Sequence, residues 1–287
     1  MTAGMEFCLL GPLAVRRDGV VVPIPPGKQR VLLAALLLDA GRVISLDELA
    51  ETMWGPAPPR SARVTVQNYV KRLRSALGDA GHARIATQPG GYVISVGPGE
   101  LDVSRFEALL ASARVAAGAG RWDVAAREAC AALSLWRGEP LADVDSDALA
   151  RCETPRLAEM RLQALELRID ADLHLGRHAE VIAELRWLTG AHPLCERLHA
   201  QLMLALYRDD RQGEALAAYR QARRLLVDEL GVEPGARLRD LHQRMLAADP
   251  ALAAPRAGPA VTDGPPLMAP AWREGSSEPW LLVAVPR

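Results

Sequence analysis

The first 24 residues alternate between short apolar runs and turn residues, a pattern that predicts strands. Glu6–Leu10 is short and mostly apolar, and Asp18-Gly19 separates two Val-rich runs within Leu13–Ile24. An Asp-Gly pair in this position is a strong signal for a two-residue β-hairpin. We therefore expect a small antiparallel sheet that ends at Pro25-Pro26-Gly27.

Three segments with helical composition follow the predicted sheet. The first covers Lys28–Ala40. The second covers Leu46–Trp54, and Ser45 with Glu48 has the spacing of a capping box at its start. The third covers Ser61–Leu77, so the N-terminal part of the chain is expected to hold three helices.

The helix predicted at Ser61–Leu77 has two faces of opposite character. Its apolar stripe repeats at helical period and comprises Val66, Val70, Leu73 and Leu77. The opposite face carries Asn68, Lys71, Arg72 and Ser75, with Arg63 and Arg74 at its flanks. Such a helix is roughly 25 Å long and has a diameter that fits the major groove of DNA.

The charge around this helix favours DNA over a merely solvated face. Five cations and no acid lie between Glu51 and Asp79, whereas a solvated helix face usually carries acidic partners four residues from its cations. Residues 1–99 hold eleven Lys and Arg against seven Asp and Glu, a net charge of +4. Residues 100–248 have a net charge of −4, and the whole chain −1. This division indicates a nucleic-acid contact with another function attached.

A second hairpin follows the three predicted helices. Ile85–Thr87 and Tyr92–Val96 are rich in β-branched residues and are separated by Gln88-Pro89-Gly90-Gly91, a Gly-rich turn. A sheet, three helices and a hairpin, in this order, make a winged helix-turn-helix.

Residues 5–97 resemble the DNA-binding domain of OmpR-type response regulators. The resemblance is carried by Leu46–Gly55, Val66–Gly78 and Thr87–Tyr92. It implies that the third helix enters the major groove and that the hairpin, the wing, reaches the adjacent minor groove. Gln88-Pro89 stands where many relatives have an Arg, which argues against Arg insertion into the minor groove. No receiver pattern occurs in the chain, so control by a phosphoryl-aspartate is not expected.

The same resemblance assigns roles to individual side chains. Arg72 matches a position that reads bases, whereas Lys71 and Arg74 match phosphate contacts. A good pair between Arg and guanine is worth about 1–3 kcal/mol of discrimination. Trp54 matches a residue that lies at the DNA backbone, but Trp54 and Tyr69 could equally be core aromatics. The predicted DNA-binding residues are Trp54, Arg63, Thr65, Asn68, Lys71, Arg72, Arg74, Thr87 and Tyr92.

From Leu101 to Leu246 the pattern is helical almost throughout. Gly176–Glu180 and Asp210–Glu214 align at an offset of 34 residues, which is the tetratricopeptide period. Stacked helix pairs of this kind form a curved surface that usually holds a protein partner. We expect helices at Ser104–Ala117, Trp122–Trp136, Pro155–Leu175, Ala179–Thr189, Leu194–Tyr207, Gly213–Leu230 and Ala236–Ala247.

A winged helix followed by such a region is similar to the Streptomyces antibiotic regulatory protein family, whose second part is a bacterial transcriptional activator domain. The likeness is carried by Leu101–Glu107, Ala132–Gly138 and Leu225–Gly235. It implies a pathway-specific activator of antibiotic and other secondary-metabolite genes. Such a regulator binds direct repeats in double-stranded DNA near the −35 element and recruits the RNA polymerase holoenzyme through its sigma factor and core subunits. A homodimer on DNA is a further family expectation.

The expected fold is mainly α with a small β part. The winged helix takes residues 1–98, the tetratricopeptide-like activator domain residues 99–248, and a disordered tail rich in Pro, Ala and Gly residues 249–287. Since no P-loop motif occurs, the chain resembles the small, stand-alone form of the family that lacks an ATPase module.

No motif indicates catalysis, a cofactor or a metal site, so an enzyme is not expected. His174 and His178 are four residues apart, but they lack the Glu of H-E-x-x-H and flank Gly176, which favours a helix end. The longest apolar run, Val31–Leu38, is too short to cross a bilayer, and we expect a cytoplasmic protein. The cysteines form no C-x-x-C and are expected to be reduced thiols: Cys8, Cys130, Cys152 and Cys195.

One alternative belongs to another class of protein. A tetratricopeptide scaffold would use the winged helix to dock a protein instead of DNA. The acid-free stretch from Thr52 to Gly78 argues against this alternative, because a docking module has no reason to keep five cations there.

Overall fold

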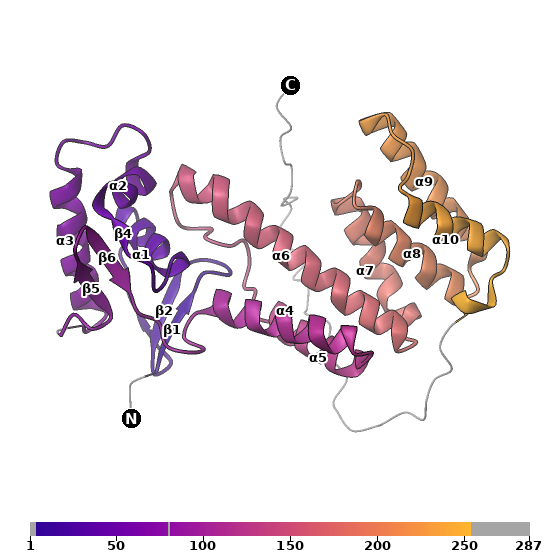
Figure 1. Ribbon diagram of the computed structural model, residues 1–287, viewed down its shortest axis with the longest axis horizontal. Coiled ribbons are helices and arrows are strands. Elements are labelled where there is room, and N and C mark those ends of the chain that lie inside the picture. Colours follow the sequence, from indigo (N-terminus) through magenta and orange to yellow (C-terminus); the bar gives the residue numbers. More distant parts are fainter. Residues whose placement is uncertain (1–3, 80, 254–287) are drawn as a thin grey trace. The chain divides into compact units, whose positions relative to one another are not determined.

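The computed structural model describes residues 4–79 and 81–253 (Figure 1). Among them, residues up to 111 together with 131–163 form one compact unit, and residues 112–130 with 164–253 form a second. The fold is mainly α with a small β part, which confirms the predicted fold class.

The first unit opens with the predicted antiparallel sheet. Its strands are β1 (Met5–Cys8), β2 (Ala14–Arg17) and β3 (Val20–Val22), hydrogen-bonded in the order β1-β2-β3. Asp18 and Gly19 have φ angles of +49° and +79°, the positive values that a tight hairpin turn requires at both central positions. The Asp-Gly signal therefore predicted the turn correctly.

Three helices follow this sheet and pack on one another. They are α1 (Lys28–Leu38), α2 (Leu46–Trp54) and α3 (Ala62–Ala76). α1 is apolar on nearly every side and is buried from Val31 to Leu37, because it contacts both α2 and α3. α1 is therefore the centre of the core on which the other two helices are positioned.

A second small sheet holds the wing in place. It comprises β4 (Ile44–Ser45), β5 (Ile85–Gln88) and β6 (Gly91–Ile94), in the order β4-β6-β5. The sequence did not predict β4, which is only two residues long and is a strand because it pairs with β6. A Cβ atom on Gly91 would lie 2.0 Å from the carbonyl oxygen of Ile44, so this pairing requires glycine at position 91.

Asp102 joins the N-terminal sheet to the first residues of the helical region. Its carboxylate accepts hydrogen bonds from the backbone N–H of Leu9 at 2.8 Å and of Leu10 at 2.9 Å, and the group is buried. Burial raises the pKa of Asp102, although the backbone hydrogen bonds act in the opposite direction. The compact unit therefore extends past residue 98.

Two further contacts bind the same unit together. Asp143 accepts a hydrogen bond from the backbone N–H of Leu13 at 2.7 Å and forms an ion pair with Arg30 of α1. The Ser146 hydroxyl donates to the backbone carbonyl oxygen of Thr52 in α2 at 2.6 Å. Residues 143–146 are thus fixed directly to the helices of the winged helix.

The predicted helices of the remaining chain are present, with one large shift. α6 begins at Asp147, eight residues before the predicted start at Pro155, which lies inside the helix. Ser146 precedes this start, and its hydroxyl oxygen accepts from the backbone N–H of Leu149 at 3.4 Å. The helices are α4 (Asp102–Gly118), α5 (Trp122–Leu133), α6 (Asp147–His174), α7 (His178–Ala191), α8 (Glu196–Arg208), α9 (Gln212–Leu230) and α10 (Ala236–Leu246).

The sequence repeat corresponds to a repeated turn in the second unit. Gly176 and Asp210, 34 residues apart, both have positive φ angles, of +79° and +57°. The helices that follow begin at His178 and Gln212, again 34 residues apart. α7 packs on α8 and α8 on α9, as stacked helix pairs require.

The last described residues are ordered. Pro250–Leu252 forms a short 3-10 helix, and the carbonyl oxygen of the buried Leu252 accepts a hydrogen bond from Arg208 at 3.0 Å. The rest of the predicted disordered tail lies outside the described residues. Within the described part of the chain, no helix is long and apolar enough to span a membrane.

Candidate nucleic-acid interface

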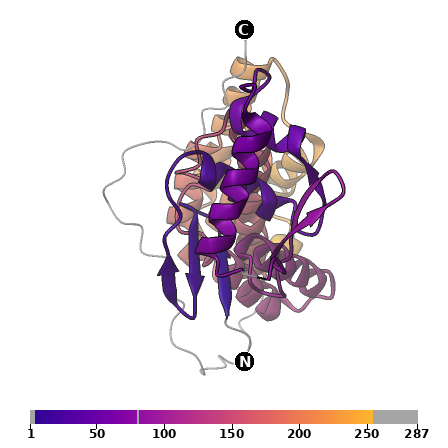
Figure 2. The same ribbon diagram turned by 90° about the vertical axis from the view of Figure 1, so that its left-hand side faces the viewer.

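α3 presents one apolar and one polar face. Val66, Val70 and Leu73 are buried against the rest of the first unit. A second stripe begins two residues earlier, and all four of its residues are exposed: Val64, Asn68, Lys71 and Ser75. Two residues correspond to about 200° around an α-helix, so this stripe points almost directly away from the core. Figure 2 shows α3 on the face turned toward the viewer, with the β5–β6 hairpin beside it.

Two cations on this face are available to a ligand. Lys71 and Arg72 are exposed, and neither makes an ion pair within the described residues. The guanidinium of Arg72 lies 5.8 Å from the ring centroid of Tyr69, which is itself partly buried. Tyr69 therefore offers an aromatic face to the guanidinium of the predicted base-reading side chain.

Arg74 is engaged with the wing. Its Nε and Nη2 atoms donate to the carbonyl oxygen of Ile85 at 2.9 and 2.7 Å, and Nη2 also donates to the Thr87 hydroxyl at 2.9 Å. The guanidinium lies 5.7 Å from the ring centroid of Tyr92. Three predicted site residues are thus brought together, with Arg74 fixing the wing to α3. A phosphate contact by Arg74 stays a prediction.

Arg63 pairs with an acid that the sequence analysis did not consider. Its Nε and Nη2 atoms donate to the two carboxylate oxygens of Asp47 at 3.0 and 2.7 Å. Asp47 lies in the first turn of α2, and both side chains are about two-thirds exposed (65% and 71%). Asp47 lies on the preceding helix, so the spacing of charges within α3 does not indicate this pair.

The remaining predicted residues lie around α3 in different environments. Trp54 ends α2 and is partly exposed, whereas Tyr92 is only 8% exposed and belongs to the core beneath Arg74. The Thr65 hydroxyl donates to the backbone carbonyl oxygen of Ser61 at 3.0 Å, and Thr87 is exposed on the wing. Val64 is exposed on the outward face and is not among the predicted site residues, because charge patterning gives no signal for an uncharged side chain.

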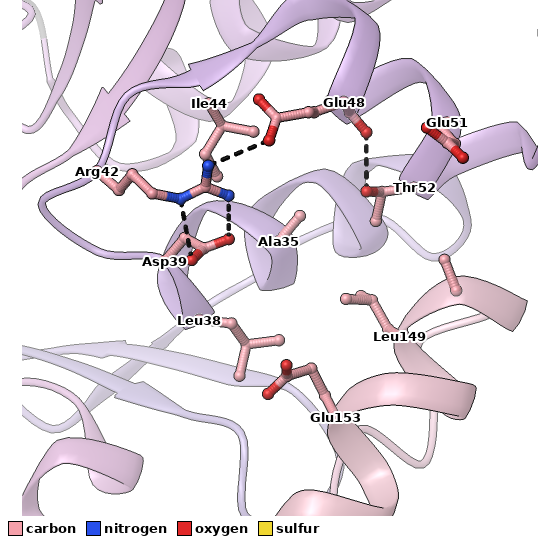
Figure 3. Close-up of a pocket in the computed structure, with 11 residues that line it drawn as sticks. Ala35, Leu38, Asp39, Arg42, Ile44, Glu48, Glu51, Thr52, Leu149 and Glu153 are labelled. Carbon is pink, nitrogen blue, oxygen red and sulfur yellow. Dashed lines mark hydrogen bonds and ion pairs between the residues drawn. The ribbon is translucent and has the colours of Figure 1, made fainter.

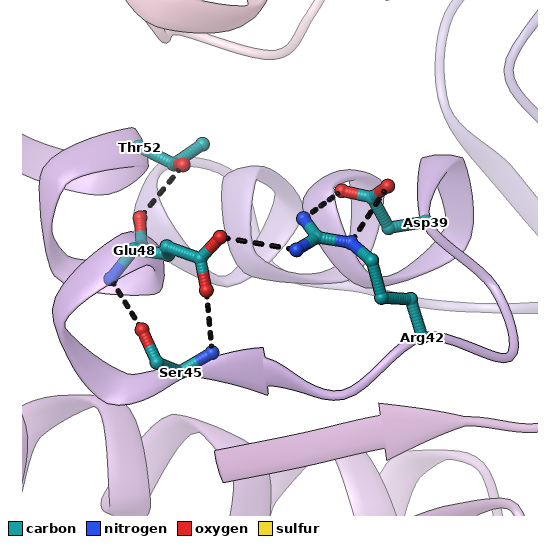
Figure 4. A network of polar contacts seen from close by, with 5 residues as sticks. All are labelled: Asp39, Arg42, Ser45, Glu48 and Thr52. Atoms are coloured by element: carbon teal, nitrogen blue, oxygen red, sulfur yellow. Dashed lines mark hydrogen bonds and ion pairs between the residues drawn. The ribbon is translucent and has the colours of Figure 1, made fainter. Parts of the chain in front are cut away.

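A polar network fixes the start of α2 (Figure 4). Ser45 and Glu48 form the predicted capping box, with reciprocal hydrogen bonds of 3.1 and 2.9 Å. The backbone N–H of Ser45 and the Arg42 guanidinium hold the pKa of Glu48 below its usual range. Arg42 also pairs with Asp39 at the end of α1. α2, which supports α3, is therefore anchored to α1 at its N-terminal end.

The first unit also contains a cavity of about 230 Å³ away from α3 (Figure 3). Its lining comes from the end of α1, from β4 and α2, and from the start of α6, with apolar groups such as Leu38 and Leu149. Four carboxylates also line it: Asp39, Glu48, Glu51 and Glu153. Only Arg42 opposes them with a positive charge, so this side of the unit is unfavourable for DNA phosphates.

Both parts of the chain match models of known protein families. Residues 25–94 match the model described as transcriptional regulatory protein, C terminal. Residues 101–246 match the bacterial transcriptional activator domain.

Several curated regulators are similar over most of this chain. The regulatory protein AfsR of Streptomyces coelicolor is 47% identical over 253 residues, which cover 88% of this chain and 25% of AfsR. The regulatory protein DnrI of Streptomyces peucetius is 41% identical over 265 residues, 90% of this chain and 97% of DnrI. This chain therefore spans about a quarter of AfsR and nearly all of DnrI.

A solved structure shares the fold. It is that of Mycobacterium tuberculosis EmbR in complex with a low affinity phosphopeptide, with 39% sequence identity and a TM-score of 0.83. The match covers 86% of this chain and 66% of that chain.

Proposed function

Because the chain belongs to the Streptomyces antibiotic regulatory protein family of transcriptional regulators, we propose that it binds promoter DNA through α3 and the β5–β6 wing and activates transcription from there. The observation that carries this proposal is the outward face of α3, where Lys71 and Arg72 are exposed and have no acidic partner within the described residues.

The chemistry of this face fits the major groove. Arg72 would pair with a guanine edge, and Lys71 would neutralise a phosphate without reading sequence. The wing, held to α3 by Arg74, would lie over the backbone of the same site, with Thr87 as an exposed hydroxyl. The acidic cavity lined by α1, α2 and α6 would face away from the phosphates.

The family supports finer proposals about the promoter. We propose direct repeats near the −35 element as the site, because two copies in head-to-tail arrangement need no two-fold protein interface. RNA polymerase holoenzyme is the proposed partner of the activator domain, whose stacked helices α7–α9 are of a type that usually holds proteins. The regulated genes would be those of a secondary-metabolite pathway.

Selection of bound fragments from genomic DNA tests this proposal. The full chain is incubated with the fragments at two salt concentrations, and the enriched sequences are read. We expect a short direct repeat upstream of a gene cluster, retained at the higher salt. Binding that is lost with salt and enriches no sequence would refute sequence-specific recognition. The tetratricopeptide scaffold would then be the better interpretation.

A further inference from the structure

We propose that Val64 contacts the 5-methyl group of a thymine in the operator and makes this chain prefer thymine at one position. The inference deepens the proposed function, because it names a further base-contacting residue on α3. It rests on α3 entering the major groove.

Val64 lies on the outward face of α3, in line with two polar side chains. Asn68 and Lys71 follow it at i+4 and i+7, so the three side chains form one line along α3. The buried line formed by Val66, Val70 and Leu73 has the same spacing and starts two residues later. Val64 is therefore close to the centre of the outward face, where a groove-binding helix comes nearest to the bases.

Val64 presents a branched aliphatic side chain to the solvent. Its side chain is 60% exposed, and it is the single large apolar side chain on α3 with that exposure among the described residues. In the major groove, thymine presents a methyl group where cytosine has only a hydrogen, and apolar side chains read this difference by contact. One branched aliphatic side chain is sufficient for this contact.

A protein partner is a less suitable occupant of this face. Protein interfaces bury contiguous apolar patches, whereas Val64 is followed along its line by Asn68, Lys71 and Ser75. An amide, an ammonium and a hydroxyl beside one methyl-bearing side chain match the mixed polar and apolar edges of base pairs.

The experiment removes the methyl group from the DNA and the side chain from the protein in turn. Each thymine of the selected operator is replaced singly by uracil, which lacks only the 5-methyl group. The Kd of the full chain is then measured at fixed salt. We expect one replacement to raise the Kd of the unchanged protein about fourfold, the effect of losing one buried methyl group. For Val64→Ala, we expect the same replacement to have no effect.

Val115→Ala is the matched control. Val115 is 67% exposed on α4, so the same Val-to-Ala substitution is made there on an exposed helix position outside α3. It should retain the full uracil penalty. Alanine is the best helix former, so Val64→Ala should fold. The proposal is overturned if no thymine is sensitive to uracil, or if Val64→Ala keeps the penalty. If the unchanged protein selects no sequence at all, the proposed function itself fails, which is a distinguishable result.

Discussion

Arg74 of α3 donates two hydrogen bonds to the backbone carbonyl oxygen of Ile85 in the wing, at 2.9 and 2.7 Å. A guanidinium can do this because its N–H groups form a fixed fork. The consequence is that the helix proposed to read bases and the hairpin proposed to touch the backbone are positioned by one side chain. They would meet DNA as a single preformed surface.

Arg74→Ala should therefore weaken both the fold and DNA binding. A hydrogen bond from a charged donor contributes about 1.5–3 kcal/mol, and the partly buried carbonyl group of Ile85 would lose its donors. We expect a lower free energy of unfolding, measured by chemical denaturation. Arg74→Lys separates the two roles, since it keeps the charge and loses the fork. If Arg74→Lys restored full DNA affinity without restoring stability, Arg74 would act as a phosphate contact.

Arg72 and Lys71 should respond differently to truncation, although they are neighbours. Arg72→Ala should cost about 1–3 kcal/mol at the cognate site and relax the preference at one base pair. Lys71→Ala should weaken all DNA sequences alike and reduce the salt slope by about one unit. Titrations of cognate and scrambled duplexes over a range of salt measure both effects. Identical behaviour of the two variants would contradict the assignment of reader and anchor.

Asp47 is expected to restrain Arg63 in the free protein. Asp47→Ala would release the guanidinium and remove a negative charge near α3, so DNA affinity should rise and the salt slope should steepen by up to about one unit. Stability should change by less than about 1 kcal/mol, because the pair is exposed. Adding Arg63→Ala to Asp47→Ala should remove most of the gain in affinity. An unchanged salt slope in Asp47→Ala would show that Arg63 does not reach a phosphate.

Asp102→Ala should be among the most destabilising single substitutions in the first unit, because Asp102 is buried. It leaves the backbone N–H groups of Leu9 and Leu10 without their acceptor, at about 1–3 kcal/mol for each buried donor. Asp102→Asn keeps one acceptor oxygen and should be intermediate. Thermal unfolding of the full chain, followed by circular dichroism, should show this order; equal melting temperatures in all three proteins would contradict it.

The contribution of Asp102 to the free energy of unfolding should change with pH in a defined direction. Burial raises the pKa of Asp102 in the folded protein, whereas an Asp in the unfolded chain has a pKa of about 3.9. The folded protein therefore keeps the carboxyl proton of Asp102 to a higher pH than the unfolded chain does. The contribution of Asp102 to the free energy of unfolding should therefore fall as pH rises through the interval between these two pKa values, and be constant above it. This component should be absent from Asp102→Asn.

Cys195 and Cys152 should differ in reactivity. Burial, reinforced by a hydrogen bond to Glu166, raises the pKa of Cys195 to about 11, so little thiolate exists near neutral pH. Cys152 is exposed. Iodoacetamide at pH 7.5 should label Cys152 first, as peptide mass spectrometry would show. Equal labelling rates in the native protein would contradict the partly buried position of the Cys195 thiol.

Local rules predicted much of the first unit. The Asp18-Gly19 turn depends on backbone preferences of two adjacent residues, and the capping box on two side chains three residues apart. Such features are specified by the residues that form them. The same holds for the buried stripe of α3.

Features that depend on distant partners could not be predicted in this way. β4 exists because β6 pairs with it, and α6 begins at Asp147 with Ser146 held by Thr52 of α2. Proline favours the first turn of a helix, yet Pro155 lies inside α6. At the candidate interface, the sequence indicated the basic face but not that Asp47 and Ile85 engage two of its cations.

The Asp102 contacts bear on how this architecture can be inherited. A fragment that stopped at residue 98 would contain every residue proposed to face DNA, yet the amides of Leu9 and Leu10 would have lost their carboxylate, and Arg30 its partner Asp143. The part proposed to bind DNA therefore depends on contacts from residues beyond the wing, and an exchange of residues 1–98 alone would remove them. A viable exchange between regulators would have to carry residues 99–111 and 131–163 along with it, or preserve a matching carboxylate in the recipient.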